Sequence, residues 1–502
     1  MTRHTRLFRS CMFAATVAVA LSAHGQTPTC VAPGCNSVTS DAHGNTATGT
    51  GALPSPQPTN GAINNSAFGN DALFNTTTGE GNTAIGTGAL FTNTTGLEST
   101  AVGAGSMFSN VNTQHNTAVG YGTLYSNTGG NALTAIGHLA LNANTTGAEN
   151  TALGGGALLT NTTGSFNTAL GRHTLHLNVG GSQNTATGEY ALYSNTSADS
   201  NTATGYQALT LNTTGIQNSA VGVNALASNT TGNRNNASGM GALSSNTTAS
   251  DNNAMGANAL FDNTTGTLNN AVGNFALEFN TIGNNNNAVG YGSLLHNTTG
   301  SDNSGQGYFS LAANTTGNLN VGVGYKAGSN LTTGSNNIDI GNTGVAAEAN
   351  TIRIGTQGTQ SAAFVAGISG VTVSGAAVLV SPTGQLGIAS SSRQFKEDIQ
   401  NMGGASEKIM QLRPVQFRYR QADAQGNKPV QYGLVAEEVA EVMPELVVTD
   451  ADGNPQSVAY HVLPALLLNE VQREHEQLQT QAAEIAELKA QIDQLRAATT
   501  HR

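Results

Sequence analysis

The sequence predicts a mainly β protein: a parallel β-solenoid (β-roll) of 17-residue coils, followed by a small α+β domain and a C-terminal coiled-coil helix. Glycines that follow a tetrad such as residues 82–85 recur with one fixed period from Gly69, through Gly86, to Gly341. The unit reads N-T-A-[VI]-G-x-x-A-L-x-x-N-T-T-G-x-x. A fixed short period indicates a solenoid. Frequent Gly and Asn-Thr-Thr-Gly exclude a continuous helix.

Each coil of the array, residues 61–355, is expected to contain two short strands and one corner. Residues 83–86 would form the first strand and the segment around Ala89 and Leu90 the second. Residues 93–96, Asn-Thr-Thr-Gly, would form the corner, because Asn and Gly tolerate left-handed backbone conformations.

Two irregular tetrads suggest which side of the strand faces inward. Asp339 and Arg353 stand where Ala usually stands, and isoleucines flank both. Strand alternation then predicts that the Ile and Val positions face the core and the Ala position faces outward.

The core expected for one coil is thin. Large side chains such as Ile85 and Leu90 contribute roughly 1.5 to 3 kcal/mol each when buried. Ordering the backbone costs about 1 to 2 kcal/mol per residue. We therefore expect the outward Ala faces to pack against other copies of the chain.

The N-terminus, residues 1–25, has the pattern of a secretory signal peptide. Arg3, Arg6 and Arg9 precede an apolar run over 11–21, and a small-residue cleavage site follows. The run is shorter than a membrane span requires, so we expect an exported chain without a spanning segment. Residues 26–60, rich in Pro, are predicted to be a flexible lead-in.

Cys30 and Cys35 lie in a short Pro-Gly segment of this lead-in. In an oxidising compartment two thiols pair more often than they bind metal, and pairing within one chain or between chains both remain open. No calcium-binding nonapeptide is present, so neither a metal nor a cofactor is expected.

The charge pattern excludes a nucleic-acid-binding array. Charged residues make up 9% of the chain, and more than half of them follow Ser390. The array carries few cations to meet phosphates. They are Arg172, Arg234, Lys326 and Arg353.

Several coils carry a tyrosine directly after the repeat glycine. These tyrosines could form a patch for sugars, but plain surface or interface aromatics are the favoured interpretation. The residues are Tyr121, Tyr206, Tyr291, Tyr308 and Tyr325.

Over residues 45–355 the array resembles the head repeats of trimeric autotransporter adhesins, whose N-S-V-A-I-G units wind a β-roll shared by three chains. The resemblance implies a trimer. The chain departs from that family in its coil length, and no membrane β-barrel is expected at its C-terminus.

After a closing segment, residues 356–390, composition changes at Ser391. Strands are expected over 368–375 and 378–380, with a turn at 381–384. Residues 391–470 then resemble the intramolecular chaperone domain of peptidase family S74, which ends phage tail spikes and fibres and the myelin regulatory factor. The motifs are residues 391–399, 412–419, 432–439, 444–448 and Tyr460.

The S74 resemblance implies that the domain trimerises, templates the upstream fold and then cuts itself off with a Ser and a Lys. Ser391 precedes Lys396 by five residues, so a neutral Lys396 amine could take the proton of the Ser391 hydroxyl. The predicted cleavage site lies between Ser390 and Ser391. The family often has Asp after the nucleophile, whereas here Ser392 follows.

A helix is predicted over 463–497. Apolar residues fall on two heptad positions, which favours a coiled coil over a lone amphipathic helix. The first row is Val471, Leu478, Ile485 and Ile492, and the second is Leu467, Leu488 and Leu495, which Glu474 and Gln481 interrupt.

Together these features predict an exported, homotrimeric fibrous protein, secreted or at the cell surface, that is adhesin-like or tail-fibre-like. The C-terminal domain would drive trimerisation and folding, and its enzymatic activity would be at most one self-cleavage by a Ser/Lys endopeptidase. Besides other copies of the chain, the expected partner is a host or surface glycan or protein. The alternative is a secreted spike that binds or degrades polysaccharide.

Overall fold

The structure is a computed structural model of the 502-residue chain and describes residues 39–54, 61–366, 377–381, 383–422, 426–450 and 452–500. The described chain divides into two compact units between Thr359 and Gln360. The predicted signal peptide, Cys30, Cys35 and the strand expected over 368–375 lie outside the described residues.

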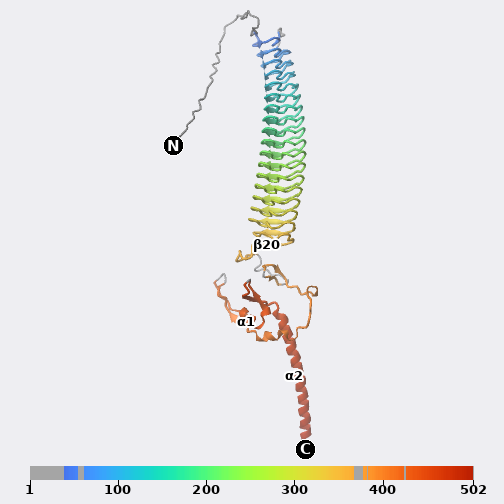
Figure 1. Ribbon diagram of the computed structural model, residues 1–502, viewed down its shortest axis with the longest axis vertical. Coiled ribbons are helices and arrows are strands. Elements are labelled where there is room, and N and C mark those ends of the chain that lie inside the picture. Colours follow the sequence, from blue (N-terminus) through green and yellow to red (C-terminus); the bar gives the residue numbers. More distant parts are fainter. Residues whose placement is uncertain are drawn as a thin grey trace, which may run out of the picture. The chain divides into compact units, whose positions relative to one another are not determined.

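The first unit is a ladder of short strands, which Figure 1 shows as coils stacked in chain order. Strand β2 and its successors pair in parallel, each with the next one along the chain, and β1 pairs antiparallel with β2. The strands are β1 Thr39–Ser40, β2 Thr46–Thr48, β3 Ser66–Phe68, β4 Thr83–Ile85, β5 Thr100–Val102, β6 Thr117–Val119, β7 Thr134–Ile136, β8 Thr151–Leu153, β9 Thr168–Leu170, β10 Thr185–Thr187, β11 Thr202–Thr204, β12 Ser219–Val221, β13 Asn236–Ser238, β14 Asn253–Met255, β15 Asn270–Val272, β16 Asn287–Val289, β17 Ser304–Gln306, β18 Val321–Val323, β19 Ile338–Ile340 and β20 Ile352–Ile354.

The register of the ladder follows the sequence period. Thr83 of β4 pairs with Thr100 of β5, and the same step holds for each pair from β3 to β19. The last step is shorter, because Ile338 pairs with Ile352. The predicted parallel solenoid of 17-residue coils is therefore confirmed. The ladder also includes β2, inside the segment expected to be a flexible lead-in.

The predicted inside and outside of the strand are wrong. Ala84 is completely buried, whereas Ile85 is 42% exposed, and the middle residue is buried in each strand from β3 to β19. Asp339, at the Ala position, is likewise buried, with 1% exposure. The interior of the coil is narrow, so the row that stacks there is mostly Ala, and the larger branched residues lie at the surface.

The expected second strand is a turn. Leu90 has a left-handed backbone with φ of 52°, and its side chain is completely buried. A left-handed non-glycine residue costs roughly 1–2 kcal/mol. Burying Leu offsets this with about 1.5–3 kcal/mol. Gly86, with φ of 131°, must be Gly because a Cβ would lie 2.6 Å from the Gly103 carbonyl in the next coil.

The asparagines at the Asn82 and Asn93 positions of the repeat form two buried columns, and Asn82 and Asn93 do not have a left-handed backbone. The Asn82 amide donates to Gly96 O at 2.7 Å and to Asn65 Oδ1 at 3.1 Å, while Asn82 Oδ1 accepts from Ser99 N. In the second column, Asn110 Nδ2 donates to Asn93 Oδ1 at 3.1 Å. These side chains satisfy buried backbone groups that so short a coil leaves without partners in its own strand.

The second unit combines short antiparallel pairs with helices. Strands β21 (Leu379–Val380) and β22 (Leu386–Gly387) form a hairpin, β23 (Val415–Phe417) pairs with β24 (Gln431–Gly433), and β25 (Val447–Thr449) pairs with β26 (Pro455–Val458). The 3-10 helices are η1 Arg393–Phe395, η2 Gly403–Gln411 and η3 Pro444–Leu446, and the α-helices are α1 Ala436–Val442 and α2 Leu463–Thr500. A small apolar core includes Ile409, Val439 and Leu466.

Candidate functional site

Ser391 and Lys396 are brought together at the start of the second unit. The short helix η1 turns the chain between them, and Lys396 Nζ lies 3.5 Å from Ser391 Oγ. Phe395 N donates to Ser392 O and Lys396 N to Arg393 O, so two backbone hydrogen bonds hold this turn. The five-residue spacing thus places an amine next to a hydroxyl, which is the geometry needed for proton transfer between them.

The surroundings of this pair are open. Ser391 and Lys396 are both exposed, and apolar side chains nearby in sequence are exposed as well, including 64% of Ile388 and 69% of Phe395. An amine accepts a proton only when it is neutral, and burial favours the neutral form. Within one described chain, nothing provides that burial.

Tyr460 ties two parts of the second unit together, a contact that the sequence motifs do not reveal. Its hydroxyl accepts a hydrogen bond of 2.9 Å from Leu434 N, directly after β24. A Cβ on Gly433 would lie 2.6 Å from the same hydroxyl. Gly433 and Tyr460 therefore fit each other, although they lie far apart in the sequence.

A polar cluster fixes the start of α2 against η2. Ser406, completely buried, donates to Glu470 Oε1 at 2.5 Å, and Arg473 bridges Glu470 and Glu407. The Ser406 hydrogen bond and the Arg473 charge lower the pKa of Glu470. Sequence reasoning missed this cluster, because η2 and α2 are distant in the sequence and no motif links them.

Beyond this contact α2 leaves the body of the unit, as Figure 1 shows. The predicted helix is confirmed, and its bounds are Leu463–Thr500. Both predicted heptad rows are exposed, with exposed fractions from 47% at Ile492 to 68% at Leu495. Apolar side chains at this spacing form a surface suited to other helices.

Part of this unit matches a known family model. Residues 391–448 match the family model Peptidase_S74, described as chaperone of endosialidase. The match confirms the resemblance drawn from the sequence and begins at Ser391. No curated protein and no solved structure matches the chain.

The S74 segment, residues 391–448, thus follows a solenoid whose own surface carries an apolar row. We call the last residue of each strand, one per coil, the strand-end ridge. Its exposed large apolar members are Phe68, Ile85, Ile136, Leu153, Leu170, Val221, Met255, Val289, Val323, Ile340 and Ile354. Exposed apolar surface this extensive is typical of an interaction surface.

Of the five predicted tyrosines, three lie in consecutive coils. The ring centroids of Tyr291, Tyr308 and Tyr325 follow one another at 5.5 Å. Tyr121 instead stacks on His138, and Tyr206 contacts Tyr190 edge-on. The structure therefore gathers only part of the predicted tyrosine set.

The end of the solenoid contains a buried acid next to a cation. The pKa of Asp339 is raised to about 6, mainly by burial and also by the nearby charge of Glu348, while Arg353 opposes the rise. Arg353 instead forms an ion pair of 2.6 Å with Glu348. Among the described residues, Asp339 Oδ2 has no hydrogen-bond partner.

Two further searches cover only the residues that the structure describes. In that part of the chain, no helix is both long and apolar enough to cross a bilayer. Over the same residues, no group of three or more His, Cys, Asp or Glu side chains could hold a metal ion.

Proposed function

We propose that this chain is an exported, homotrimeric fibrous protein, secreted or at the cell surface, whose S74 segment and α2 start trimerisation and folding of the solenoid. The single observation that carries the proposal is the match at residues 391–448, C-terminal to the solenoid. Proteins that combine an S74 chaperone with a β-fibre are tail-fibre-like. An adhesin-like role fits the same architecture.

The strand-end ridge supports assembly into a trimer. Leu153 and Leu170 leave 41% and 40% of their surface exposed. Thr187 and Thr204 interrupt the ridge, and large apolar members resume at Val221. In place of the Ala face expected from the sequence, these larger side chains would pack between copies. Burying them contributes about 25 cal/mol per Å² of apolar area removed from water.

A C-terminal trimerisation unit solves a problem of register. Neighbouring coils are nearly identical, so two chains can align one coil out of phase at little local cost. The heptad rows of α2 would join three chains at one defined point. The coils of the three chains would then associate in the same register. Slow pairing between distant segments otherwise leaves apolar surface open to aggregation.

Light scattering of the chain from residue 26 onward tests this proposal, and we expect three times the chain mass. The double substitution Leu153→Asp and Leu170→Asp should lower the mass towards that of a monomer. The matched control changes Thr146 and Thr163 to Asp, because these residues are exposed in the Asn-Thr-Thr-Gly corners that precede the same two strands and not on the strands. A wild-type chain with the mass of a monomer would refute the trimer.

We further propose that the S74 segment releases itself by cleavage between Ser390 and Ser391. Lys396 Nζ takes the proton of the Ser391 hydroxyl, and the Ser391 oxygen attacks the carbonyl carbon of Ser390. The amide nitrogen then leaves as the Ser391 amine and regains a proton from Lys396. Water hydrolyses the resulting ester, which frees the Ser390 carboxylate and regenerates the Ser391 hydroxyl. In the trimer, neighbouring chains would bury the Ser391 and Lys396 pair that one chain leaves exposed.

A polysaccharide-binding spike is the second candidate function. The row formed by Tyr291, Tyr308 and Tyr325 favours it. Among the described residues, no comparable observation favours a polysaccharide-degrading enzyme.

A further inference from the structure

We propose that Tyr291, Tyr308, Tyr325 and Lys326, here called the tyrosine platform, bind a linear acidic polysaccharide along the fibre axis. This inference deepens the second candidate function, a polysaccharide-binding spike, and assigns a ligand class to the position after the repeat glycine in three consecutive coils. It rests on the solenoid and does not require the trimer.

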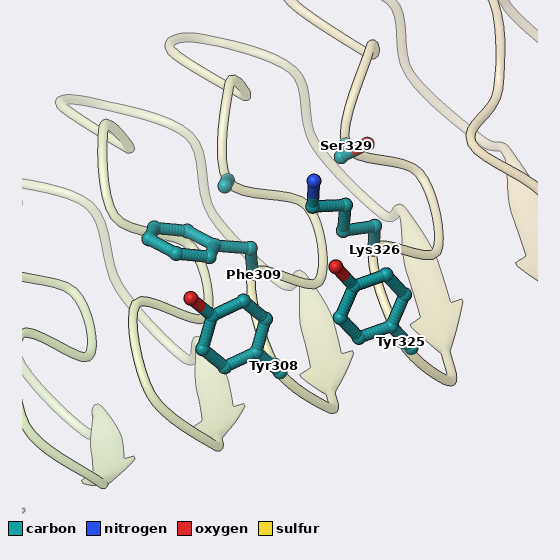
Figure 2. A pocket seen from close by; sticks show the side chains of 6 residues that line it. Tyr308, Phe309, Tyr325, Lys326 and Ser329 are labelled. Carbon is teal, nitrogen blue, oxygen red and sulfur yellow. The ribbon is translucent and has the colours of Figure 1, made fainter.

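The platform presents parallel rings at a regular interval. Tyr291 and Tyr308 have an interplanar angle of 15° and Tyr308 and Tyr325 one of 4°, with 5.5 Å between centroids in each pair. Figure 2 shows the Tyr308 and Tyr325 rings side by side, with their hydroxyls pointing the same way. The exposed fraction rises from 42% at Tyr291 to 69% at Tyr325.

Phenylalanines support the tyrosine rings from the side. Phe309 meets Tyr308 edge-on, with centroids 4.7 Å apart, and Tyr291 at 5.5 Å. Phe275 makes a similar contact with Tyr291 at 5.4 Å. These contacts fix the ring orientations before a ligand arrives, which lowers the entropy lost on binding.

An open hollow lies over the C-terminal part of the platform. It measures about 370 Å³, and Tyr308, Phe309, Tyr325 and Lys326 line it, as Figure 2 shows. Ala312 and Ser329 complete its walls. Its combination of flat aromatic rings with hydroxyl and amine groups is typical of ligand sites in which a few polar groups orient the ligand.

The charge of the platform favours an anion. The other three array cations are paired, Arg172 with Glu189, Arg234 with Asp251 and Arg353 with Glu348. Lys326 forms no ion pair within the described residues, and its Nζ lies 5.4 Å from the Tyr325 ring centroid. In a chain with a net charge of −11, an unpaired ammonium beside exposed rings is suited to a carboxylated ligand.

A linear polysaccharide matches the periodicity of the platform better than a peptide does. Sugar rings present C–H faces that pack on aromatic rings, and their hydroxyls can bond Tyr hydroxyls. A linear polymer repeats the same group at a fixed interval, as the coils do. A peptide would have to repeat its own side chains to match.

Binding of polygalacturonate to the full chain from residue 26 onward tests the inference, with methyl-esterified polygalacturonate as the uncharged comparison. We expect the acid form to bind more tightly. Tyr308→Ala should weaken binding of both forms about tenfold, which corresponds to roughly 1.4 kcal/mol for the lost ring contact. Lys326→Gln should remove the preference for the acid form while retaining binding of the ester.

Tyr206→Ala is the matched control. Tyr206 occupies the same repeat position and is 45% exposed, close to the 46% of Tyr308, but Glu189 and Val223 stand at its position in the adjacent coils. The control should bind both polymers as the wild type does. Equal losses in Tyr206→Ala and Tyr308→Ala would contradict a site at the platform.

Two other outcomes would overturn the inference. One is that the wild type binds none of polygalacturonate, polymannuronate and hyaluronate. The other is that Tyr308→Ala or Lys326→Gln lowers the mass measured by light scattering, which would make the platform a contact between copies. Since mass and binding are measured separately, a monomeric chain that binds the acid form would refute only the trimer.

Discussion

Ala84 and Ile85 are neighbours in β4, yet Ala84 is completely buried and Ile85 is 42% exposed. A methyl group fills the interior position, and the next coil places Ala101 against the same site. The strand therefore uses its small side chain for the coil and its large one for the surface. The Ala84 position therefore governs the stability of the coil, and the Ile85 position is available for association between chains.

The first prediction contrasts these two positions. Ala84→Leu should destabilise the solenoid by about 1–3 kcal/mol, because a close-packed interior has no room for the added atoms. Ile85→Asp should leave the coil folded and weaken association, since its charge would enter an apolar contact between copies. Thermal unfolding followed by circular dichroism measures the first effect and light scattering the second. Equal thermal destabilisation by both changes would contradict the assignment.

The second prediction concerns the buried asparagine columns. Asn82→Ala should destabilise the solenoid by roughly 2–4 kcal/mol, because Gly96 O and Ser99 N would lose partners in a buried place. Thr95→Ala, at an exposed position of the corner, should change stability by less than about 0.5 kcal/mol. Urea unfolding of both variants provides the comparison. A harmless Asn82→Ala would mean that water enters the column and replaces the amide.

The third prediction is a pH dependence of the last coils. Folded Asp339, with a pKa of about 6, keeps its proton to a higher pH than an unfolded Asp, whose pKa is about 4. Its stabilising contribution is therefore complete below about pH 4 and is lost as the pH rises through 6. The loss amounts to about 3 kcal/mol.

Hydrogen exchange of residues 338–354 at pH 4.5, 6 and 8 measures this effect. Relative to Asp339→Asn, the wild type should lose protection as the pH rises. Glu348 acts in the opposite sense, because the Arg353 hydrogen bond lowers its pKa and its contribution is lost as the pH falls. Glu348→Gln should reduce the loss of protection between pH 4.5 and 6, because it removes a charge that raises the pKa of Asp339 and leaves Arg353 free to lower it. A wild type and Asp339→Asn with the same pH profile would show that Asp339 does not titrate there.

The fourth prediction is self-cleavage. After folding, denaturing electrophoresis should show a fragment that runs from Ser391 to Arg502, which N-terminal sequencing identifies. Ser391→Ala and Lys396→Ala should each abolish the fragment and leave the chain trimeric. Ser392→Ala should still cleave, since its hydroxyl lies outside the proposed proton transfer. An uncleaved wild-type chain in a correctly folded trimer would make the segment a chaperone without protease activity.

The sequence by itself determined the solenoid, its 17-residue step and the position of the S74 segment. Gly69, Gly86 and their successors recur at one fixed spacing, so each coil stacks on the preceding coil in the same register. The long C-terminal helix was equally clear from its heptad rows. Ser391 and Lys396 could be paired in advance because five residues fit one tight turn.

Only the tertiary structure decided which side of each strand lies inside. Strand alternation places Ala84 and Ile85 on opposite faces, but it does not say which face is buried. Because Ile is more hydrophobic than Ala, the sequence favoured a buried Ile85. The choice depends on the width of the coil, which the left-handed Leu90 and the asparagine columns set together. Contacts such as Ser406 with Glu470, and the row from Tyr291 to Tyr325, likewise exist only once distant residues are placed in space.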